Sequence, residues 1–247
     1  MRVDSINHWD IAAETYSEEN NQGRNFHSQI YLAAVNELLG NVKGKRVLDA
    51  GCGDGFFSLE LARKGALVKA VDGSDAMLNI AKRKHVHHNL QYYNMNLTRK
   101  LTFEDRFFDI VVANMLLMDI PEINSFVSEV ARVLKKPGTF IFSVTHPCFF
   151  LSDWEENKNN IKVYKKIGNY LDERVEELNF WGKTLHYHRP LSRYIEAVEK
   201  AGMYVSSLRE PVPSRESIEL YPEQEYHYRI PSFLVMRAKS IEASDFT

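Results

Sequence analysis

The sequence of 247 residues holds only two cysteines, Cys52 and Cys148, too few for a framework of disulfide bonds. No apolar run approaches the ~18 residues that a membrane-spanning helix needs. The first ten residues also lack the apolar core of a secretory signal peptide. These absences argue against a disulfide-rich secreted domain and against a membrane protein. We therefore expect a soluble protein of a reducing compartment, the cytoplasm.

The sequence also lacks an excess of positive charge. Lys and Arg together number 31 and Asp and Glu number 33, which gives a formal net charge of −2. Proteins that hold nucleic acid or an anionic membrane surface usually present a strong positive field to it. The charge balance therefore disfavours nucleic acid and membrane as main partners. It does not indicate an oligomeric state.

The composition that is present, with 44% hydrophobic and 26% charged residues, is that of a globular protein. Short apolar runs alternate with single helical stripes along most of the chain. The runs predict seven strands, at 46–50, 67–72, 90–95, 107–114, 139–144, 204–208 and 233–237. Strands that alternate with helices form right-handed βαβ units. We expect an α/β fold with a mostly parallel seven-stranded sheet and helices on both faces.

The first forty residues precede this alternation and have a helical pattern of their own. Trp9, Ala13 and Tyr16 are spaced at i, i+4 and i+7, so they share one face of a helix. A second helical stripe follows and stops at Gly40. We expect residues 1–40 to form an N-terminal helical cap.

Residues 149–188 interrupt the alternation with a polar and aromatic segment that has no long helical stripe. Within it, Tyr170–Leu178 and Lys183–His188 have a composition that allows them to pair as a hairpin. We expect this segment to be a lid inserted into a domain that spans residues 41–247.

The strongest motif is Val-Leu-Asp-Ala-Gly-Cys-Gly-Asp-Gly at 47–55, where a predicted strand runs into a glycine-rich turn and then into a helix. Gly51 and Gly53 allow the backbone to turn with positive φ and leave room for a ligand against the main chain. Asp72 ends the next strand, 21 residues after Gly51, where an acid accepts hydrogen bonds from ribose hydroxyls. The motif predicts a nucleoside site at the carboxyl edge of the sheet.

Two features bear on which nucleoside is bound. Dinucleotide-binding turns carry a third glycine, and Phe56 stands at that position here. Asp49 and Asp54 flank the turn, and their carboxylates would repel a pyrophosphate. They suit a ligand with an ammonium and a sulfonium group, such as S-adenosylmethionine. A nicotinamide-dependent oxidoreductase and a non-catalytic binding module stay open as alternatives.

The turn, written Asp-x-Gly-x-Gly-x-Gly at 49–55, is followed by Asp-Gly-Ser-x-x-Met at 72–77. With these motifs the chain resembles the class I S-adenosylmethionine-dependent methyltransferases that act on small molecules, over roughly residues 8–238. The resemblance implies a Rossmann-like fold and the transfer of a methyl group to an oxygen or nitrogen atom of a small-molecule acceptor, by direct in-line displacement. The cofactor it implies is S-adenosylmethionine, which is released as S-adenosylhomocysteine.

The resemblance also implies which residues bind this cofactor. They are Tyr16, Asp49, Gly51, Gly53, Asp72, Gly73, Met77, Asn96, Leu97 and Asn114. Asp49 and the glycine backbone are expected at the methionine part, with Asn114 beside them, and Asp72 at the ribose. Met77 is expected near the adenine. Asn96 stands where the family usually has an aspartate, and its side-chain oxygen is expected to accept from the adenine amino group.

His146 follows the fifth predicted strand at the ligand edge of the sheet. A histidine there is a candidate general base or substrate contact. The alternative is a turn residue that Pro147 orders.

The acceptor is expected under the inserted lid. His186 and His188 alternate on one face of a predicted strand, as side chains that point inward do. Trp181 and Tyr187 are available to line the same cavity. Arg189 either holds a carboxylate of the substrate or forms a structural ion pair.

We expect no metal site. His85, His87 and His88 lie together, but in a polar stretch that has no nearby set of thiols or carboxylates. They are expected in a solvated loop.

Overall fold

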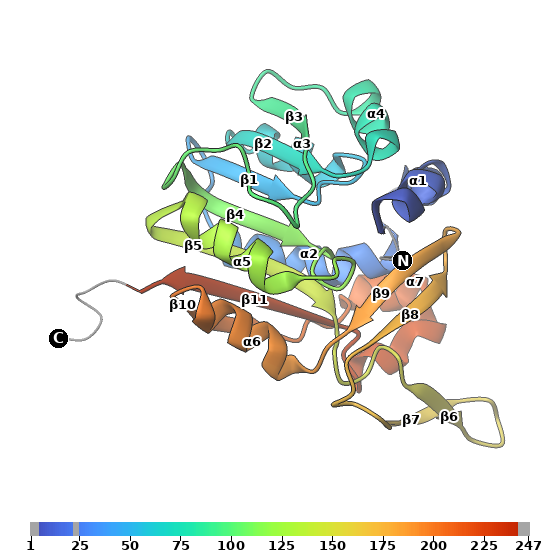
Figure 1. Ribbon diagram of the computed structural model, residues 1–247. Coiled ribbons are helices and arrows are strands. Elements are labelled where there is room, and N and C mark those ends of the chain that lie inside the picture. The colour runs from blue at the N-terminus through green and yellow to red at the C-terminus, as the bar shows by residue number, and fades with distance from the viewer. Residues whose placement is uncertain (1–4, 22–24, 242–247) are drawn as a thin grey trace.

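The computed structural model describes residues 5–21 and 25–241 (Figure 1). Its centre is a sheet of seven strands: β1 (Arg46–Ala50), β2 (Leu67–Asp72), β3 (Leu90–Asn94), β4 (Phe108–Asn114), β5 (Leu134–Thr145), β10 (Met203–Arg209) and β11 (Phe233–Ser240). Their order in space is β10-β11-β5-β4-β1-β2-β3. Neighbouring strands from β3 to β5 are parallel, and β11 runs antiparallel between β5 and β10. The predicted α/β fold with a mostly parallel sheet is confirmed.

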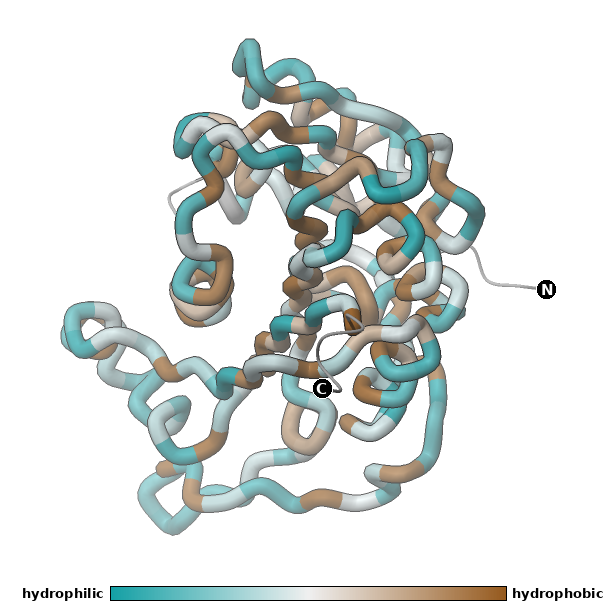
Figure 2. The backbone as a smooth tube through the Cα atoms, turned by 90° about the vertical axis from the view of Figure 1, so that its left-hand side faces the viewer, coloured by the Kyte–Doolittle hydropathy of each residue, from teal (hydrophilic) through white to brown (hydrophobic). Residues whose placement is uncertain are grey.

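Helices cover both faces of this sheet. On one face lie α5 (Ile123–Val133) and α6 (Leu191–Lys200), whose apolar side chains pack on β4, β5 and β11. On the other face lie α2 (Phe26–Leu39), α3 (Phe56–Arg63) and part of α4 (Asp75–Lys84). Figure 2 shows that hydrophobic residues concentrate in the middle of the molecule, whereas the outer loops are mostly hydrophilic. The two buried layers hold the carboxyl ends of the central strands in place.

The first helix, α1 (Ser5–Asn21), stands away from the sheet and packs on α4 (Figure 1). Ala13 lies in a small apolar cluster with Met77 and Ile80, and Trp9 and Tyr16 pack against this cluster. By contrast, α2 buries one side in the core of the sheet. We expected two helices in the cap. Only α1 lies outside the core of the sheet, where a cap would lie, whereas α2 is part of that core.

The segment after β5 forms two hairpins. The first joins β6 (Asp153–Glu156) to β7 (Lys162–Lys166), and the second joins β8 (Arg174–Asn179) to β9 (Lys183–His188). The second confirms the predicted hairpin, with a first strand that is shorter than expected. It rises beside α1, so the cap and the insertion meet although they are far apart in the sequence (Figure 1). After β10 the chain forms α7 (Arg215–Leu220) and a 3₁₀ helix at Pro222–Tyr228 before it enters β11.

One strand boundary differs from the prediction. We expected the fifth strand to begin at residue 139, but β5 begins at Leu134. Leu134 pairs with Phe108 of β4, and the Gly138 N–H donates to Ser240 Oγ, so partners distant in sequence extend the strand. Within 5–21 and 25–241, no helix is long and apolar enough to span a membrane.

Candidate active site

A cavity of about 940 Å³ is lined by residues at the carboxyl ends of the central strands and by residues of α1 and the β8–β9 hairpin. Among the site residues predicted from the sequence, those that line it are Tyr16, Gly51, Gly53, Asp72, Gly73, Met77, Asn96, Leu97, Asn114, Trp181, His186 and Tyr187. Asp49, His146, His188 and Arg189 do not line it. The structure therefore brings together most of the predicted cofactor residues and three of the predicted acceptor residues.

The glycine-rich turn presents its backbone to this cavity. Gly51 and Gly53 have φ angles of 74° and 53°, in the left-handed region that favours glycine. A Cβ atom on Gly51 would lie 2.8 Å from the Leu116 side chain, so packing inside the protein accounts for that glycine. A Cβ on Gly53 would meet no atom within 4 Å. The space in front of Gly53 is therefore open for a ligand.

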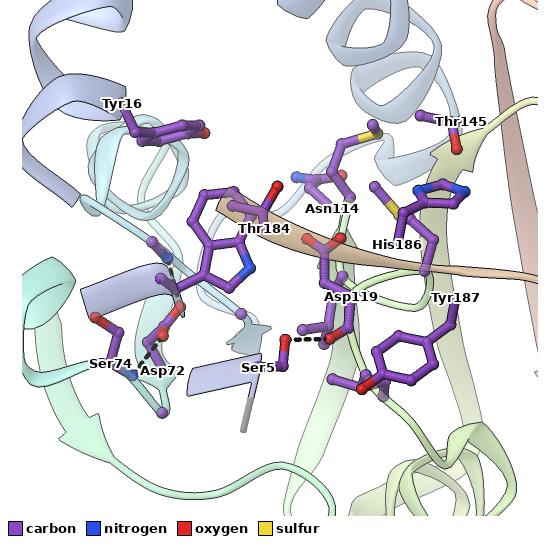
Figure 3. Close-up of a pocket in the computed structure, with 18 of the residues that line it drawn as sticks. Ser5, Tyr16, Asp72, Ser74, Asn114, Asp119, Thr145, Thr184, His186 and Tyr187 are labelled. Carbon is purple, nitrogen blue, oxygen red and sulfur yellow. Dashed lines mark hydrogen bonds between the residues drawn. The ribbon is translucent and has the colours of Figure 1, made fainter. Parts of the chain in front are cut away.

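Asp72 is oriented by two backbone groups. Its Oδ2 accepts from the Gly53 N–H at 2.8 Å, and its Oδ1 accepts from the Ser74 N–H at 2.9 Å (Figure 3). Burial raises the pKa of the Asp72 carboxyl, and the backbone N–H groups oppose that rise. A carboxylate offers about four lone-pair sites, so Asp72 keeps capacity to accept from a ribose hydroxyl.

Asn114 ends β4 and supplies a donor without a partner. Its Oδ1 accepts from Ser143 Oγ at 3.3 Å, whereas its buried Nδ2 has no hydrogen-bond partner among the described residues. Buried polar groups are nearly always satisfied, so an orphan donor on a cavity wall is suited to a ligand acceptor. The carboxylate of S-adenosylmethionine is such an acceptor, and together with Gly53 and Asp72 this donor fits that cofactor.

Asn96 lines the cavity, but its oxygen is already used. The Asn96 Oδ1 accepts from the Thr98 N–H at 2.9 Å and from Thr98 Oγ1 at 2.7 Å. Both lone pairs of the oxygen are engaged in this local turn. The expectation that this oxygen accepts from the adenine amino group is therefore not supported, and the amide hydrogens are what Asn96 can offer a ligand.

The two acids that flank the turn point away from the cavity. Asp49 is buried, its Oδ2 accepts from Ser58 Oγ at 2.5 Å, and burial raises its pKa to about 7. Asp54 accepts from Ser17 Oγ and from the Phe56 N–H, at 3.3 Å each. Neither carboxylate faces a ligand directly, so their predicted contact with an ammonium group is not supported. They hold the turn to α3 and α1.

Aromatic side chains join α1 to the lid. The rings of Trp9 and Tyr16 pack edge to face at 5.6 Å, and Trp181 lies 6.0 Å from Trp9 and 5.0 Å from Tyr16. The Trp181 Nε1–H also donates to Glu19 Oε2 at 2.8 Å. All three rings line the cavity, so they form a wall that shields part of it from water.

His146 lies beside the cavity rather than in it. Its Nε2 is 2.8 Å from Glu210 Oε1, and its ring stacks on Phe149 with centroids 4.5 Å apart. Burial lowers the pKa of His146, and Glu210 partly opposes this shift. The residue before it, Thr145, lines the cavity instead. This placement favours the structural alternative over a general base.

His188 and Arg189 are likewise engaged with the backbone. The His188 Nε2 is 2.8 Å from the Tyr170 carbonyl oxygen. The buried Arg189 guanidinium donates to the carbonyl oxygens of Leu117, Ile120 and Pro121, at 2.7–3.0 Å. Arg189 therefore neither faces a substrate carboxylate nor forms the expected ion pair. It holds the turn that follows β4.

That turn carries Asp119, a cavity residue that sequence reasoning missed. Its position after the fourth strand was a usable signal, because carboxyl ends of parallel strands meet at one edge of the sheet. Ser5, Thr145, Phe150, Thr184 and Phe233 also line the cavity and were not predicted. They come from α1, from the end of β5 and the segment after it, from β9 and from β11, which no local pattern brings together.

Comparisons with known proteins agree with this site. A family model described as a methyltransferase domain matches residues 48–142. A crystal structure of an S-adenosylmethionine-dependent methyltransferase from Mesorhizobium loti is 25% identical, with a TM-score of 0.76 over 84% of this chain and 96% of that chain. A Listeria monocytogenes protein assigned to the same class is 29% identical, with a TM-score of 0.76 over 85% of this chain and 96% of that one.

Curated relatives match a shorter part. The ubiquinone biosynthesis O-methyltransferase of Nitrosomonas europaea is 34% identical over 115 residues, which are 44% of this chain and 47% of the relative. This chain thus matches about half the length of that enzyme. An uncharacterized protein of Haemophilus influenzae is 26% identical over 216 residues, 83% of this chain and 85% of that protein.

The fold, the cavity and these relatives define an S-adenosylmethionine-dependent methyltransferase. More specifically, the chain belongs to class I, the Rossmann-like group, and its cofactor is S-adenosylmethionine. The nicotinamide-dependent oxidoreductase and the non-catalytic module are not favoured.

Proposed function

We propose that the enzyme transfers a methyl group from S-adenosylmethionine to an oxygen or nitrogen atom of a small molecule. One observation carries this proposal. A single cavity joins an end with Gly53 and Asp72 to an end under the aromatic residues of the β8–β9 hairpin. Its volume of about 940 Å³ lies near the top of the range of about 300–1,000 Å³ for ligand pockets. Such a volume supports a cofactor and an acceptor bound together.

We assign the cofactor end as follows. When bound, S-adenosylmethionine supplies an electrophilic methyl group on a sulfonium sulfur. Asp72 accepts from the ribose hydroxyls, and the Nδ2 of Asn114 donates to the carboxylate of the methionine part. The buried side chains of Met77 and Leu97 provide apolar walls for the adenine. Each assignment uses a group that the fold leaves facing the cavity.

The chain's main contribution to the reaction is alignment. Trp9, Tyr16 and Trp181 close one side of the cavity, so they exclude water and restrict the acceptor. Correct alignment of two bound reactants lowers a barrier by about 7–11 kcal/mol in favourable cases. The name of the Nitrosomonas europaea relative supports an oxygen acceptor, although the match covers only about half of that enzyme.

The test is to incubate the enzyme with methyl-labelled S-adenosylmethionine and a cell extract separated into small-molecule, protein and nucleic-acid fractions. We expect the label in the small-molecule fraction, where mass spectrometry locates the methyl group on oxygen or nitrogen. Label in the RNA fraction or the protein fraction alone would contradict the proposal. A lack of S-adenosylhomocysteine binding would contradict the cofactor assignment itself.

We also infer a cytoplasmic location. The two cysteines support it, since both Cys52 and Cys148 are unpaired thiols. Fractionation of cells that express the full chain tests this inference.

A further inference from the structure

Asp119 is an acidic side chain at the acceptor end of the cavity, which is the end under the aromatic residues of the β8–β9 hairpin. It lies in the turn that follows β4, and its carboxylate points into the cavity beside Asn114 and His186, across from Asp72 (Figure 3). Among the described residues, none gives this carboxylate a hydrogen bond or an ion pair. A half-buried carboxylate without a partner is costly, and such groups gather at functional sites.

The backbone around Asp119 is held firmly, although its side chain is not. Its carbonyl oxygen accepts from Ser5 Oγ at 2.6 Å, and its N–H donates to the Leu116 carbonyl at 2.8 Å. The Tyr187 N–H donates to the Met118 carbonyl at 2.7 Å. The guanidinium of Arg189 donates hydrogen bonds to carbonyl oxygens on both sides of Asp119, those of Leu117 and Ile120. The turn is thus tied to α1 and to β9, so the carboxylate has a defined place to meet a ligand.

The surroundings of Asp119 contain little positive charge. Among the lining residues that the structure describes, Arg99 alone carries a fixed positive charge, and it follows Asn96 and Leu97 at the adenine end. Burial lowers the pKa of His186 to about 4, so that ring is neutral near pH 7. Phe150 and Phe180 give this end apolar walls, and its polar residues Thr145, Thr184 and Tyr187 carry no positive charge. An acceptor with a carboxylate or a phosphate would find no cationic partner here.

We propose that the acceptor end is a binding site for an amino or hydroxyl group on an apolar body, and that Asp119 holds this group. The inference rests on the proposed function, because it names the class of acceptor for the same cavity. A hydroxyl group or a neutral amine that donates a hydrogen bond to Asp119 has its lone pair turned elsewhere, toward the rest of the cavity. An ammonium group held there must first lose a proton to water before its nitrogen has a lone pair to accept a methyl group. Asp119 and the aromatic walls then select for amines and alcohols and against acids.

Burial and the charge of Asp72 raise the pKa of Asp119 well above its ordinary value. The rise reflects a carboxylate whose charge no neighbouring group stabilises. Few water molecules reach a buried carboxylate to stabilise its charge. A bound ammonium or hydroxyl group therefore stabilises that charge more than it would at the protein surface.

The experiment uses three compounds of one shape: 3-phenylpropylamine, 3-phenylpropanol and 3-phenylpropanoate. Each is titrated calorimetrically into the full chain, with and without saturating S-adenosylhomocysteine. We expect the amine and the alcohol to bind at least about tenfold more tightly than the acid. In Asp119→Asn this preference should shrink to within about threefold, while the affinity for S-adenosylhomocysteine stays within about threefold of the wild type. Asp105→Asn, at an exposed acid, is the matched control.

Several results would overturn the proposal. They are equal or tighter binding of the acid, a preference that survives in Asp119→Asn, and binding of none of the three compounds. A loss of S-adenosylhomocysteine affinity of about tenfold or more in Asp119→Asn would instead make Asp119 a cofactor ligand. Asp119→Ser is the second variant if the first does not fold. Failure of the wild type to bind S-adenosylhomocysteine contradicts the proposed function alone, because the titrations without it still report on Asp119.

Discussion

The indole nitrogen of Trp181 donates a hydrogen bond of 2.8 Å to Glu19, although the two residues are 162 positions apart. Glu19 lies on α1, and Trp181 lies in the turn between β8 and β9. The bond therefore links the N-terminal helix to the lid beside the cavity. Because residues of both elements line the cavity, we expect this link to open and close during turnover.

We predict that S-adenosylhomocysteine slows amide hydrogen exchange in residues 5–21 of the wild type. The ligand gives Tyr16 and Trp9 a surface to pack on, so α1 opens less often. Trp181→Ala should reduce this protection and speed dissociation of the ligand. Trp154→Ala serves as a control, since Trp154 lies on β6 and does not line the cavity. Equal exchange with and without ligand would refute the role of α1 as a cap.

We predict that Arg189→Met lowers the free energy of unfolding by about 2–4 kcal/mol, because three buried carbonyl oxygens lose a charged donor. Urea denaturation measures this change. The control is Arg209→Met, which removes an exposed pair with Glu37 at 2.9 Å and should cost less than about 1 kcal/mol. Similar small losses in both variants would show that Arg189 does not hold the turn.

We predict that His186 makes the fold sensitive to acid. Burial lowers its pKa from 6.5 to about 4 in the folded state. As the pH falls below about 6.5, the unfolded chain takes up a proton that the folded chain refuses, so stability falls until about pH 4. Between about pH 8 and pH 5 the wild type should lose roughly 1–2 kcal/mol more than His186→Phe.

Urea denaturation at the two pH values checks the His186 prediction. His88→Phe is the control, because His88 is exposed and lies away from the cavity. If His186→Phe and the wild type lose the same stability, the burial of His186 has no such consequence.

We predict that Gly53→Ala weakens binding of S-adenosylhomocysteine by more than about tenfold. The new methyl group would stand in the open space where the ligand is expected. Gly44→Ala is a matched control, since Gly44 also has a positive φ, of 72°, and open space but does not line the cavity. Both variants should lose about 1–2 kcal/mol of stability through backbone strain. Unchanged affinity in Gly53→Ala would remove this glycine from the ligand site.

The sheet and the glycine-rich turn could be predicted because their signals are local. Apolar runs mark strands whatever their partners, and Gly51, Gly53 and Asp72 occupy positions that strand geometry places at one edge. The hairpin of β8 and β9 was likewise readable from its composition. The β6–β7 hairpin was not predicted, since most of its side chains are polar or charged and its strands are short.

The roles of individual side chains were harder to predict, because their partners lie far along the chain. His146 reaches a site-edge position as expected, but Glu210, 64 residues later, engages its ring outside the cavity. Arg189 donates to backbone carbonyl oxygens, and because every residue has one, the sequence does not show which of them are its partners. Asp119 was missed for a different reason: its position after β4 pointed to the cavity, but the lack of a partner for its carboxylate is visible only in the structure.

The central claim is that Asp72 and the glycine-rich turn bind S-adenosylmethionine. Calorimetric titration of S-adenosylhomocysteine into the wild type and Asp72→Ala tests it most directly, with Asp105→Ala as the control for loss of an acid. We predict one site per chain in the wild type, and in Asp72→Ala a loss of about 1–3 kcal/mol of binding free energy, because the ribose hydroxyls lose a charged acceptor. A folded Asp72→Ala variant that binds as tightly as the wild type would contradict the account.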